Sequence, residues 1–378
     1  MRVIHVVATN ERRGAEIFAS DLVGAIANIG GVDQRVLIVR ANGAGGVSFA
    51  ASEEVIGGYS RPIPGVGIDI GAARRVRGSL TSEGADVIVA HGGDPLKHVL
   101  TALRGDGRSV VYRRIGDARQ FASRRLQELV FAAMLRRTSR VVAVADALRR
   151  ELIARYGLAA DRVVAIPNGV DPAAVVPTQP RSTIRQALGI SPDVSVVLSL
   201  GALTWEKDPL SHVGIVRRAA SLAKAPVVHL FAGDGPLRPA LEREASHSDM
   251  GYDGRVLGSR SDIGDLLAAS DALLLASRTE GMPAAVIEAG MAGVPVAGYA
   301  LSGVPEVVVD GLTGLLAPPG NAVLLAGRVA KLLQEPQECA RLGSNAAERC
   351  RGLFSIDAIA PRYLRVFEDV ARASRTLA

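Results

Sequence analysis

Two glutamates eight residues apart are the side chains of this chain best placed to do chemistry. An apolar, strand-like run over 271–276 leads into a loop that carries Glu280, and Glu288 follows on a predicted helix. Pro283 stands where the first helical residue is expected, because its ring fixes φ and it has no N–H to leave unpaired. Backbone N–H groups at the start of this helix face whatever docks there: Gly281, Met282 and Ala284. Carboxylates accept from sugar hydroxyls and a helix N-terminus favours negative charge, so the pattern predicts a site for a polyhydroxylated, anionic ligand.

A lysine earlier in the chain is suited to binding phosphate. The apolar run over 194–200 predicts a strand that ends at Gly201, where the missing side chain lets a ligand approach the backbone. Lys207 follows this glycine and can reach a diphosphate as a compact positive charge. The plainer interpretation of the lysine and of both glutamates is that they are ordinary surface residues. For the lysine this is less expected than usual, because the chain has only four: Lys97, Lys207, Lys224 and Lys331.

Two residues in the first half of the chain occupy comparable positions. Gly14 follows the first predicted strand and comes just before a helix N-terminus, which suits a close approach of phosphates to the backbone. His91 directly follows the apolar run over 86–90. The carboxyl end of a parallel strand is where ligand groups lie in doubly wound sheets. A structural histidine with satisfied hydrogen bonds is the alternative for His91.

These residues need a scaffold, and the apolar pattern predicts one of alternating strands and helices. Continuous apolar runs are typical of buried parallel strands. In the first half we predict strands at 3–8, 35–39, 86–90, 109–112, 140–145 and 162–166, with an irregular glycine-rich stretch over 42–64. In the second half we predict strands at 194–200, 227–232, 255–257, 271–276 and 294–297. Helical periodicity predicts helices at 15–29, 95–104, 121–138, 146–156, 321–334, 336–352 and 356–375.

A proline-rich stretch separates the two series of strands. Five prolines lie between residues 167 and 192, which indicates a linker. We therefore predict an α/β protein of two Rossmann-like domains facing each other across a cleft. The predicted domains are 1–172 and 173–355, followed by a C-terminal helix within 356–378.

Composition excludes several classes of protein. Aromatic residues make up 4% of the 378 residues, which argues against the stacking platforms of nucleic-acid-binding proteins. The two cysteines form no Cys-x-x-Cys pair, so we predict neither a metal site nor a disulfide framework, and a cytoplasmic setting fits. The apolar start is too short for a signal peptide, and no apolar run approaches the length of a membrane span.

The net charge of +6 is concentrated in the first predicted domain. Residues 1–172 carry 24 Lys and Arg against 17 Asp and Glu, a surplus of 7, whereas the remainder carries 20 against 21. One window holds eight arginines: Arg113, Arg114, Arg119, Arg124, Arg125, Arg136, Arg137 and Arg140. The window predicts either a solvated helix face or a surface that meets anionic lipid or an acidic acceptor.

Several segments together resemble one known family. Glu280 is followed by Gly-x-Pro and Glu288 by alanine, and this pair resembles the signature of the GT4-type retaining glycosyltransferases, which have the GT-B fold. Five further segments resemble that family in the same order along the chain: 201–208, 233–236, 258–263, 302–306 and 310–314. The resemblance implies an acceptor-side first domain, a nucleotide-sugar-binding second domain and a final helix that crosses back to the first domain.

The resemblance also implies a role for each candidate residue. Glu280 would contact the donor sugar, Lys207 the donor diphosphate and Glu288 the ribose, while His91 would lie near the acceptor. The other donor-binding candidates are Gly14, Arg260, Gly281, Met282, Pro283 and Ala284. Lys207, Glu280 and His91 are thus the predicted catalytic residues.

The sequence departs from the family at three places. Ala202 stands where members often carry a phosphate-binding arginine, and Arg13 replaces the first glycine of a Gly-Gly-Ala-Glu loop. Arg113 and Arg114 occupy the region in which many relatives carry a second histidine. The first departure implies that one phosphate contact of the family is missing or supplied elsewhere, and Arg13 would make the loop less flexible and bring a positive charge to the cleft. In the third, arginines replace a histidine that acts near the reaction centre in the family.

The resemblance implies a retaining glycosyltransferase that uses a nucleoside-diphosphate sugar and needs neither a metal ion nor another cofactor. The acceptor would be a hydroxyl of a glycan, a lipid-linked sugar or a small molecule, and no nucleic acid is expected as a partner. A cytoplasmic location is expected, at the inner face of the membrane if the arginine-rich window binds an anionic membrane surface. The alternatives are a nucleotide-sugar epimerase of the same fold and a non-catalytic nucleotide-sugar-binding protein.

Overall fold

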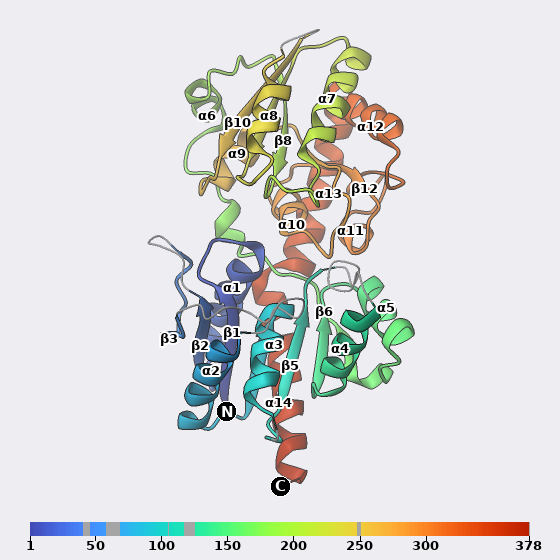
Figure 1. The fold of residues 1–378 in the computed structure, drawn as a ribbon. Coiled ribbons are helices and arrows are strands. Elements are labelled where there is room, and N and C mark those ends of the chain that lie inside the picture. The colour runs from blue at the N-terminus through green and yellow to red at the C-terminus, as the bar shows by residue number, and fades with distance from the viewer. Residues whose placement is uncertain (41–45, 58–68, 105, 117–124, 248–250, 378) are drawn as a thin grey trace. The chain divides into compact units, whose positions relative to one another are not determined.

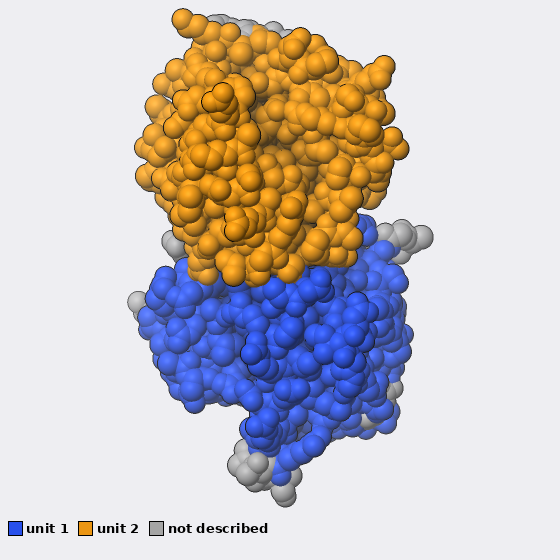
Figure 2. All heavy atoms as spheres, turned by 180° about the vertical axis from the view of Figure 1, so that it is seen from behind, with its two compact units in different colours: residues 1–169, 356–378 blue, residues 170–355 orange. Residues whose placement is uncertain are grey.

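The computed structural model describes residues 1–40, 46–57, 69–104, 106–116, 125–247 and 251–377 (Figure 1). The chain divides into two compact units, shown in blue and orange in Figure 2. Unit 1 consists of Met1–Gly169 and Ile356–Ala378, and unit 2 of Val170–Ser355. The chain therefore passes into unit 2 three residues before the predicted boundary at 172 and returns to unit 1 at Ile356.

Unit 1 is built on one parallel sheet of seven strands. The strand order is β3-β2-β1-β4-β5-β6-β7, so the chain runs from β1 outward to β3 and then starts again on the other side of β1 with β4. The strands are β1 (Arg2–Thr9), β2 (Asp33–Arg40), β3 (Ser52–Val55), β4 (Val87–His91), β5 (Val110–Arg114), β6 (Arg140–Ala143) and β7 (Val163–Ala165).

The C-terminal helix belongs to the core of unit 1. The helices are α1 (Gly14–Ile29), α2 (Ile70–Glu83), α3 (Gly93–Ala102), α4 (Arg125–Arg136), α5 (Asp146–Tyr156) and α14 (Ile356–Leu377), with a short 3₁₀ turn η2 (Ala160–Arg162). Helix α14 packs beside α1, and Tyr363 and Phe367 are fully buried in a cluster with Phe18 and Leu22 of α1. The predicted return of the final helix to the first domain is what the structure shows.

Unit 2 repeats the same plan with six parallel strands in the order β10-β9-β8-β11-β12-β13. The strands are β8 (Ser195–Leu200), β9 (Val227–Ala232), β10 (Tyr252–Gly258), β11 (Ala272–Leu275), β12 (Val296–Tyr299) and β13 (Gly314–Ala317). The helices are α6 (Arg181–Ala187), α7 (Pro209–Ala223), α8 (Arg238–Ala245), α9 (Ile263–Ala269), α10 (Ala284–Met291), α11 (Val304–Val307), α12 (Ala322–Gln334) and α13 (Pro336–Phe354), preceded by the 3₁₀ turn η3 (Pro172–Val175).

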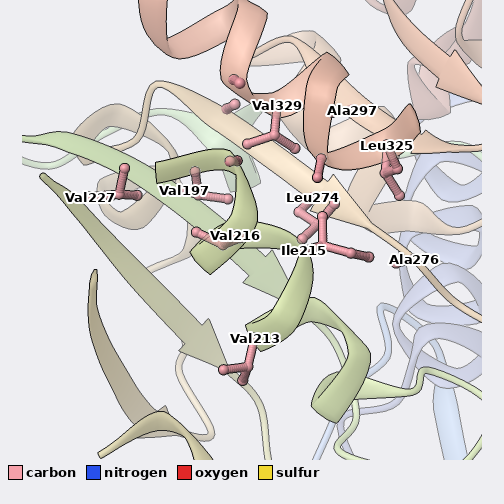
Figure 3. Close-up of a cluster of buried hydrophobic side chains, with 14 of the residues drawn as sticks. Val197, Val213, Ile215, Val216, Val227, Leu274, Ala276, Ala297, Leu325 and Val329 are labelled. Atoms are coloured by element: carbon pink, nitrogen blue, oxygen red, sulfur yellow. The ribbon is translucent and has the colours of Figure 1, made fainter. Parts of the chain in front are cut away.

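The main core of unit 2 lies where α7 and α12 cover the sheet (Figure 3). Val213 and Val216 of α7 and Val329 of α12 are fully buried there against Val197 of β8 and Leu274 of β11. The helical spacing of apolar residues on α7 gives that helix one buried face, which packs on the sheet. The helix begins at Pro209, after the loop that leaves the carboxyl end of β8. The residues before α7 are thereby placed at that edge of the sheet.

Each sheet has one position where the direction of winding reverses. In unit 2 it lies between β8 and β11, and in unit 1 between β1 and β4. Ligands of open parallel sheets bind outside the carboxyl ends of the strands at such a point, because the loops there diverge and leave a crevice. The ends of these strands and the segments that follow them hold the candidate site residues, except Arg260, which follows β10.

Several elements differ from the sequence-based predictions. The stretch 42–64, expected to be irregular, contributes the edge strand β3, and strand β13 and helix α2 were not predicted. The predicted linker over 167–192 is partly ordered as η3 and α6, and both elements belong to unit 2 and pack against α9. Residues 42–45 and 58–64 of the irregular stretch lie outside the described part of the chain.

Candidate active site

The carboxyl ends of β8 and β11 bring two predicted site residues into contact. The lysine loop, residues 201–208, carries Lys207, and the glutamate loop, residues 276–283, carries Glu280. Lys207 Nζ lies 2.6 Å from Glu280 Oε1, and Ser277 Oγ donates to the same oxygen at 2.6 Å. The Glu280 side chain is 6% exposed and that of Lys207 is 30% exposed. A buried carboxylate is thus held in place under a cation that solvent can still reach.

Arg278 fixes the glutamate loop to the lysine loop at three further points. Its backbone N–H donates to the carbonyl of Glu206 at 2.8 Å. Its guanidinium lies 2.9 Å from the carboxylate of Asp208 and 5.5 Å from the centre of the Trp205 ring. The two loops therefore lie side by side, and the relative positions of Lys207 and Glu280 depend on both.

The turn after β9, residues 233–236, packs against the backbone of the lysine loop. A Cβ atom at Gly233 would lie 1.9 Å from the carbonyl oxygen of Gly201, and one at Gly235 would lie 2.6 Å from that of Leu203. The N–H of Leu203 donates to the carbonyl of Asp234 at 2.9 Å. No larger residue fits at either glycine, so the main role of this turn is to let the two backbones pack closely.

Helix α10 starts one residue later than predicted. It begins at Ala284, and Pro283 precedes it with an extended ψ of 126°, so the proline is not the first helical residue. Gly281 and Met282 are buried in the approach to the helix, and Glu288 is half-buried on it. Ala284 and Glu288 are four residues apart and share a face of the helix. Because helical side chains lean toward the N-terminus, the Glu288 carboxylate is directed toward the first turn.

Arg260 lies at a different part of the edge and is already paired. It follows β10, two strand positions or ~10 Å from β8 at the usual strand spacing. Its Nε donates to Asp262 Oδ1 at 2.8 Å, and a second guanidinium nitrogen contacts the other carboxylate oxygen. This pairing lowers the pKa of Asp262. Asp262 is the N-cap residue of α9, but its side chain makes no cap hydrogen bond. Arg260 would have to exchange this carboxylate for a phosphate in order to bind the donor.

His91 is buried at the end of β4 with one ring nitrogen paired. Gln34 donates to the carbonyl of Val23, so its oxygen accepts from His5 Nε2 at 3.2 Å. His5 Nδ1 then accepts from His91 Nε2 at 3.0 Å, which leaves His91 Nδ1 as a bare acceptor. This atom has no partner among the described residues. Burial, the neighbouring His5 and the charge of Arg113 hold the pKa of His91 well below its usual value, so the ring is neutral.

Gly14 is the first residue of α1 rather than the residue before it. A Cβ atom placed on Gly14 would meet nothing within 4 Å, so the helix start is open to a ligand. Arg13 is paired with Glu11 and exposed, and its charge is therefore partly neutralised. Burial raises the pKa of Glu16 in the first turn of the same helix.

The arginine-rich window is only partly a surface, and this corrects its interpretation from sequence. Arg113 and Arg114 lie in β5 and are each 1% exposed. Arg113 donates to Asn168 Oδ1 at 2.6 Å and its guanidinium lies 3.6 Å from the centre of the Phe18 ring. Two of the eight arginines thus lie inside unit 1, and Arg119 and Arg124 fall outside the described residues.

Two polar residues under the site were not predicted as site residues. Ser199 and His212 line a cavity of about 20 Å³ together with Lys207 and Ser277. Such a cavity has room for roughly one water molecule. A lone histidine on the apolar face of a helix carries no sequence signal of this role, and its place five residues after Lys207 is the one hint that the sequence offers.

Potential metal ligands do not gather in the described parts of either unit. No group of three or more His, Cys, Asp or Glu side chains there is arranged to hold an ion. The expectation that the donor binds without a metal stays a prediction.

Comparison with known proteins places both units in described families. Residues 12–174 match the model "Glycosyltransferase Family 4", and residues 180–349 match "Glycosyl transferases group 1". D-inositol 3-phosphate glycosyltransferase of Kineococcus radiotolerans is 30% identical over 314 residues, which are 77% of this chain and 68% of that protein. N-acetyl-alpha-D-glucosaminyl L-malate synthase of Bacillus anthracis is 30% identical over 143 residues, only 38% of each chain.

Solved structures share the fold over nearly the whole chain. HepE of Anabaena, determined in complex with UDP and glucose, has a TM-score of 0.81 at 23% identity and covers 98% of this chain and 100% of that one. Sucrose-phosphate synthase of Thermosynechococcus elongatus has a TM-score of 0.82 at 18% identity, with 99% and 100% covered. The predicted α/β fold class, GT-B with two Rossmann-like domains and a returning C-terminal helix, is confirmed.

Proposed function

This chain belongs to the GT4-type glycosyltransferases, and on that premise we propose that its donor is a nucleoside-diphosphate sugar and its acceptor a hydroxyl compound. We further propose that the transferred sugar keeps its anomeric configuration and that no metal ion takes part. The observation that carries the proposal is the contact between Lys207 and Glu280 where the winding of the unit 2 sheet reverses. HepE, which shares the fold, was solved with UDP-glucose as well as with UDP and glucose, and this supports the same donor class here.

Lys207 is placed to bind the diphosphate and to stabilise it as it leaves. Its ammonium has three N–H donors, and Glu280 takes one of them. The other two can donate to phosphate oxygens from the exposed side of the lysine. Negative charge on the nucleoside diphosphate grows as the glycosidic bond breaks, so this contact strengthens in the transition state.

Glu280 is placed to orient the sugar. Its Oε1 already accepts from both Lys207 and Ser277, and among the described residues its Oε2 has no partner. Oε2 can therefore accept from a hydroxyl of the donor sugar. A carboxylate held by two donors is a poor nucleophile, so we assign Glu280 to positioning the sugar rather than to attacking it.

Glu288 of α10 is proposed to bind the ribose, and its replacement by alanine should weaken nucleotide binding. Removing the acceptor of two ribose hydroxyls is expected to cost about 1.5–3 kcal/mol. Calorimetric titration with UDP and with GDP measures this loss directly. Glu348→Ala, at an exposed glutamate of α13, is the matched control and should bind as the native protein does. An unchanged affinity for Glu288→Ala would remove the ribose assignment.

The proposed function itself is tested with a panel of UDP-, GDP- and TDP-sugars. A donor that binds the folded protein should raise its melting temperature. Release of the nucleoside diphosphate that requires both this donor and a hydroxyl acceptor supports transfer. Conversion of the donor without any acceptor would instead support the epimerase alternative. Tight donor binding with no turnover on any acceptor would support a non-catalytic binding protein.

Association with an anionic membrane remains part of the proposal, on a smaller surface than the sequence suggested. Arg136 and Arg137 at the end of α4 are exposed, and two such residues contribute about 2 kcal/mol near an anionic surface at low salt. None of the helices in the described residues combines the length and apolar character needed to cross a bilayer. We expect weak co-sedimentation with anionic vesicles at low salt that Arg136→Glu with Arg137→Glu abolishes. The same double change at Arg74 and Arg77 of α2 is the control, and equal loss in both would refute the assignment.

A further inference from the structure

A chain of buried hydrogen bonds runs across the unit 2 sheet, from the end of β11 through α7, β8 and β9 to β10. The backbone N–H of Ala276 lies 3.1 Å from His212 Nε2, and His212 Nδ1 lies 2.8 Å from Ser199 Oγ. Ser199 Oγ lies 2.9 Å from His229 Nε2, and His229 Nδ1 lies 3.2 Å from the hydroxyl of Tyr252. All four side chains are at least nine-tenths buried.

The first link determines which nitrogen of His212 carries the proton. A backbone N–H can only donate, so His212 Nε2 is an acceptor and the proton of this ring lies on Nδ1, which donates to Ser199. The proton of the Ser199 hydroxyl is then available to His229 Nε2, and with this pairing His229 Nδ1 donates to Tyr252. Both rings must be neutral for this arrangement. Burial lowers the pKa of His212 to about 4 and that of His229 well below its usual value.

His212 bridges the point where β8 and β11 separate. The ladder between these strands ends at Leu198 and Leu273. Beyond it the strands diverge at the reversal of the sheet, and the N–H of Ala276 finds its acceptor on α7 instead of on β8. The imidazole therefore takes the place of a missing strand–strand contact at the floor of the site, between Ser199 on one side and Ala276 on the other.

We infer that His212 is a positioning residue, which holds the glutamate loop in register with the lysine loop through its acceptor bond from the Ala276 N–H. This inference rests on the proposed function. Helix α7 begins two residues after Lys207, and His212 is the fourth residue of that helix. Ala276 lies at the start of the glutamate loop, four residues before Glu280. One ring thus ties the helix that follows the lysine to the strand end that precedes the glutamate.

Two conservative variants test the roles of the two ring nitrogens of His212 separately. In His212→Gln the side-chain oxygen can reach the position of Nε2 and accept from Ala276. In His212→Asn the shorter amide reaches only the position of Nδ1, so the contact with Ser199 can survive while Ala276 loses its acceptor. We expect kcat to fall about 10- to 100-fold in His212→Asn, as for a small misplacement of catalytic groups, and to stay within about threefold of native in His212→Gln. The dissociation constant for UDP should change less than about threefold in both.

His229→Asn is the matched control for a merely structural role. His229 is as deeply buried and belongs to the same chain, but its ring nitrogens bond Ser199 and Tyr252, which lie outside both loops. Its replacement should lower the melting temperature as much as His212→Asn does and leave kcat within about threefold of native. Equal losses of kcat in His212→Asn and His229→Asn, or in His212→Asn and His212→Gln, would overturn the inference.

The single tryptophan provides a readout that needs no activity. Trp205 is on the lysine loop and the guanidinium that lies over its ring comes from Arg278 on the glutamate loop. We expect the emission of Trp205 to change in His212→Asn and to match the native spectrum in His212→Gln and His229→Asn. An unchanged emission in His212→Asn contradicts the inference even if no donor is ever found, whereas a native protein without transfer activity refutes only the proposed function.

Hydrogen exchange of the native protein covers the case in which His212→Asn does not fold. The amide of Ala276 should exchange as slowly as the amides of β11, because its bond to His212 breaks only when the core opens. Exchange as fast as in the exposed part of the lysine loop would overturn the inference without any variant.

Discussion

Lys207→Ala is expected to lower kcat by roughly 10²-fold or more with the correct donor. Removing a group that stabilises developing charge in a closed site commonly costs 10²–10³ in turnover. The KM for the donor should rise much less, because the lysine interacts most strongly when the diphosphate carries its full leaving-group charge. Steady-state kinetics at several donor concentrations separate the two constants.

The same variant should also be less stable than the native protein. A lysine in an exposed loop can usually be replaced with little loss of stability. The structure instead pairs Lys207 with Glu280, whose side chain is 6% exposed, so the alanine variant buries a carboxylate that has lost its cation. Kinetics should therefore be measured well below the melting temperature of the variant. Lys207→Arg keeps the charge and serves as a control for stability.

Lys331→Ala is the control for the loss of charge alone. Lys331 lies on α12 of the same unit, where it pairs with Glu335 at 3.7 Å on the surface. This variant should keep native kinetics, since a surface pair of this kind contributes little. Turnover within threefold of native for Lys207→Ala would rule out its role at the diphosphate.

The position of each site loop follows from the sequence, but the contact between the loops does not. Continuous apolar runs predict buried parallel strands, and a residue that follows such a strand must lie at the carboxyl edge of a sheet. Lys207 and Glu280 are both identified in this way. Their contact requires β8 and β11 to be neighbours, although β9 and β10 lie between them in the chain. The order of strands is a property of the packed sheet, so the 2.6 Å contact appears only in the structure.

Polar residues in apolar surroundings account for the largest errors. Arg113 and Arg114 were interpreted as surface residues because charged side chains are rarely buried, yet strand β5, which has a neighbour on each side, places both inside unit 1. His212 was not identified as a site residue, since one polar residue on an apolar helix face has the pattern of an ordinary core histidine. The edge strand β3 was missed because its Ser-Glu-Glu-Val sequence pairs on one side only and has no apolar run.

Glu280→Gln is expected to separate catalysis from nucleotide binding. Glutamine preserves the shape of the side chain and still accepts through its oxygen, but it removes the charge that holds Lys207 and accepts from the sugar. Losing a charge-assisted hydrogen bond of about 1.5–3 kcal/mol corresponds to a fall of kcat of roughly 10- to 100-fold. The KM for the donor reports separately on how well the sugar is still held.

The affinity of Glu280→Gln for a free nucleoside diphosphate should change in the opposite direction. In the native protein the diphosphate must compete with Glu280 for the positive charge of Lys207, and in the variant that charge is uncompensated. UDP should therefore bind more tightly to Glu280→Gln than to the native protein, and added salt should reduce the difference. Calorimetry with UDP at two ionic strengths measures both effects.

Glu206→Gln makes the same change of charge within the lysine loop and is the control for a general electrostatic effect. Only the backbone carbonyl of Glu206 contacts the glutamate loop, through Arg278, and this contact survives the substitution. Tighter UDP binding in Glu280→Gln alone, together with slower turnover, is the result that the Lys207–Glu280 contact predicts. If UDP binds both variants equally well, Lys207 is not released by the loss of Glu280, and the ion pair is a structural feature without a role in donor binding. A fall in both affinity and turnover would instead show that Glu280 holds the Lys207 side chain in its binding position. In that case the loss of this fixed position weakens UDP binding more than the removal of the competing carboxylate strengthens it.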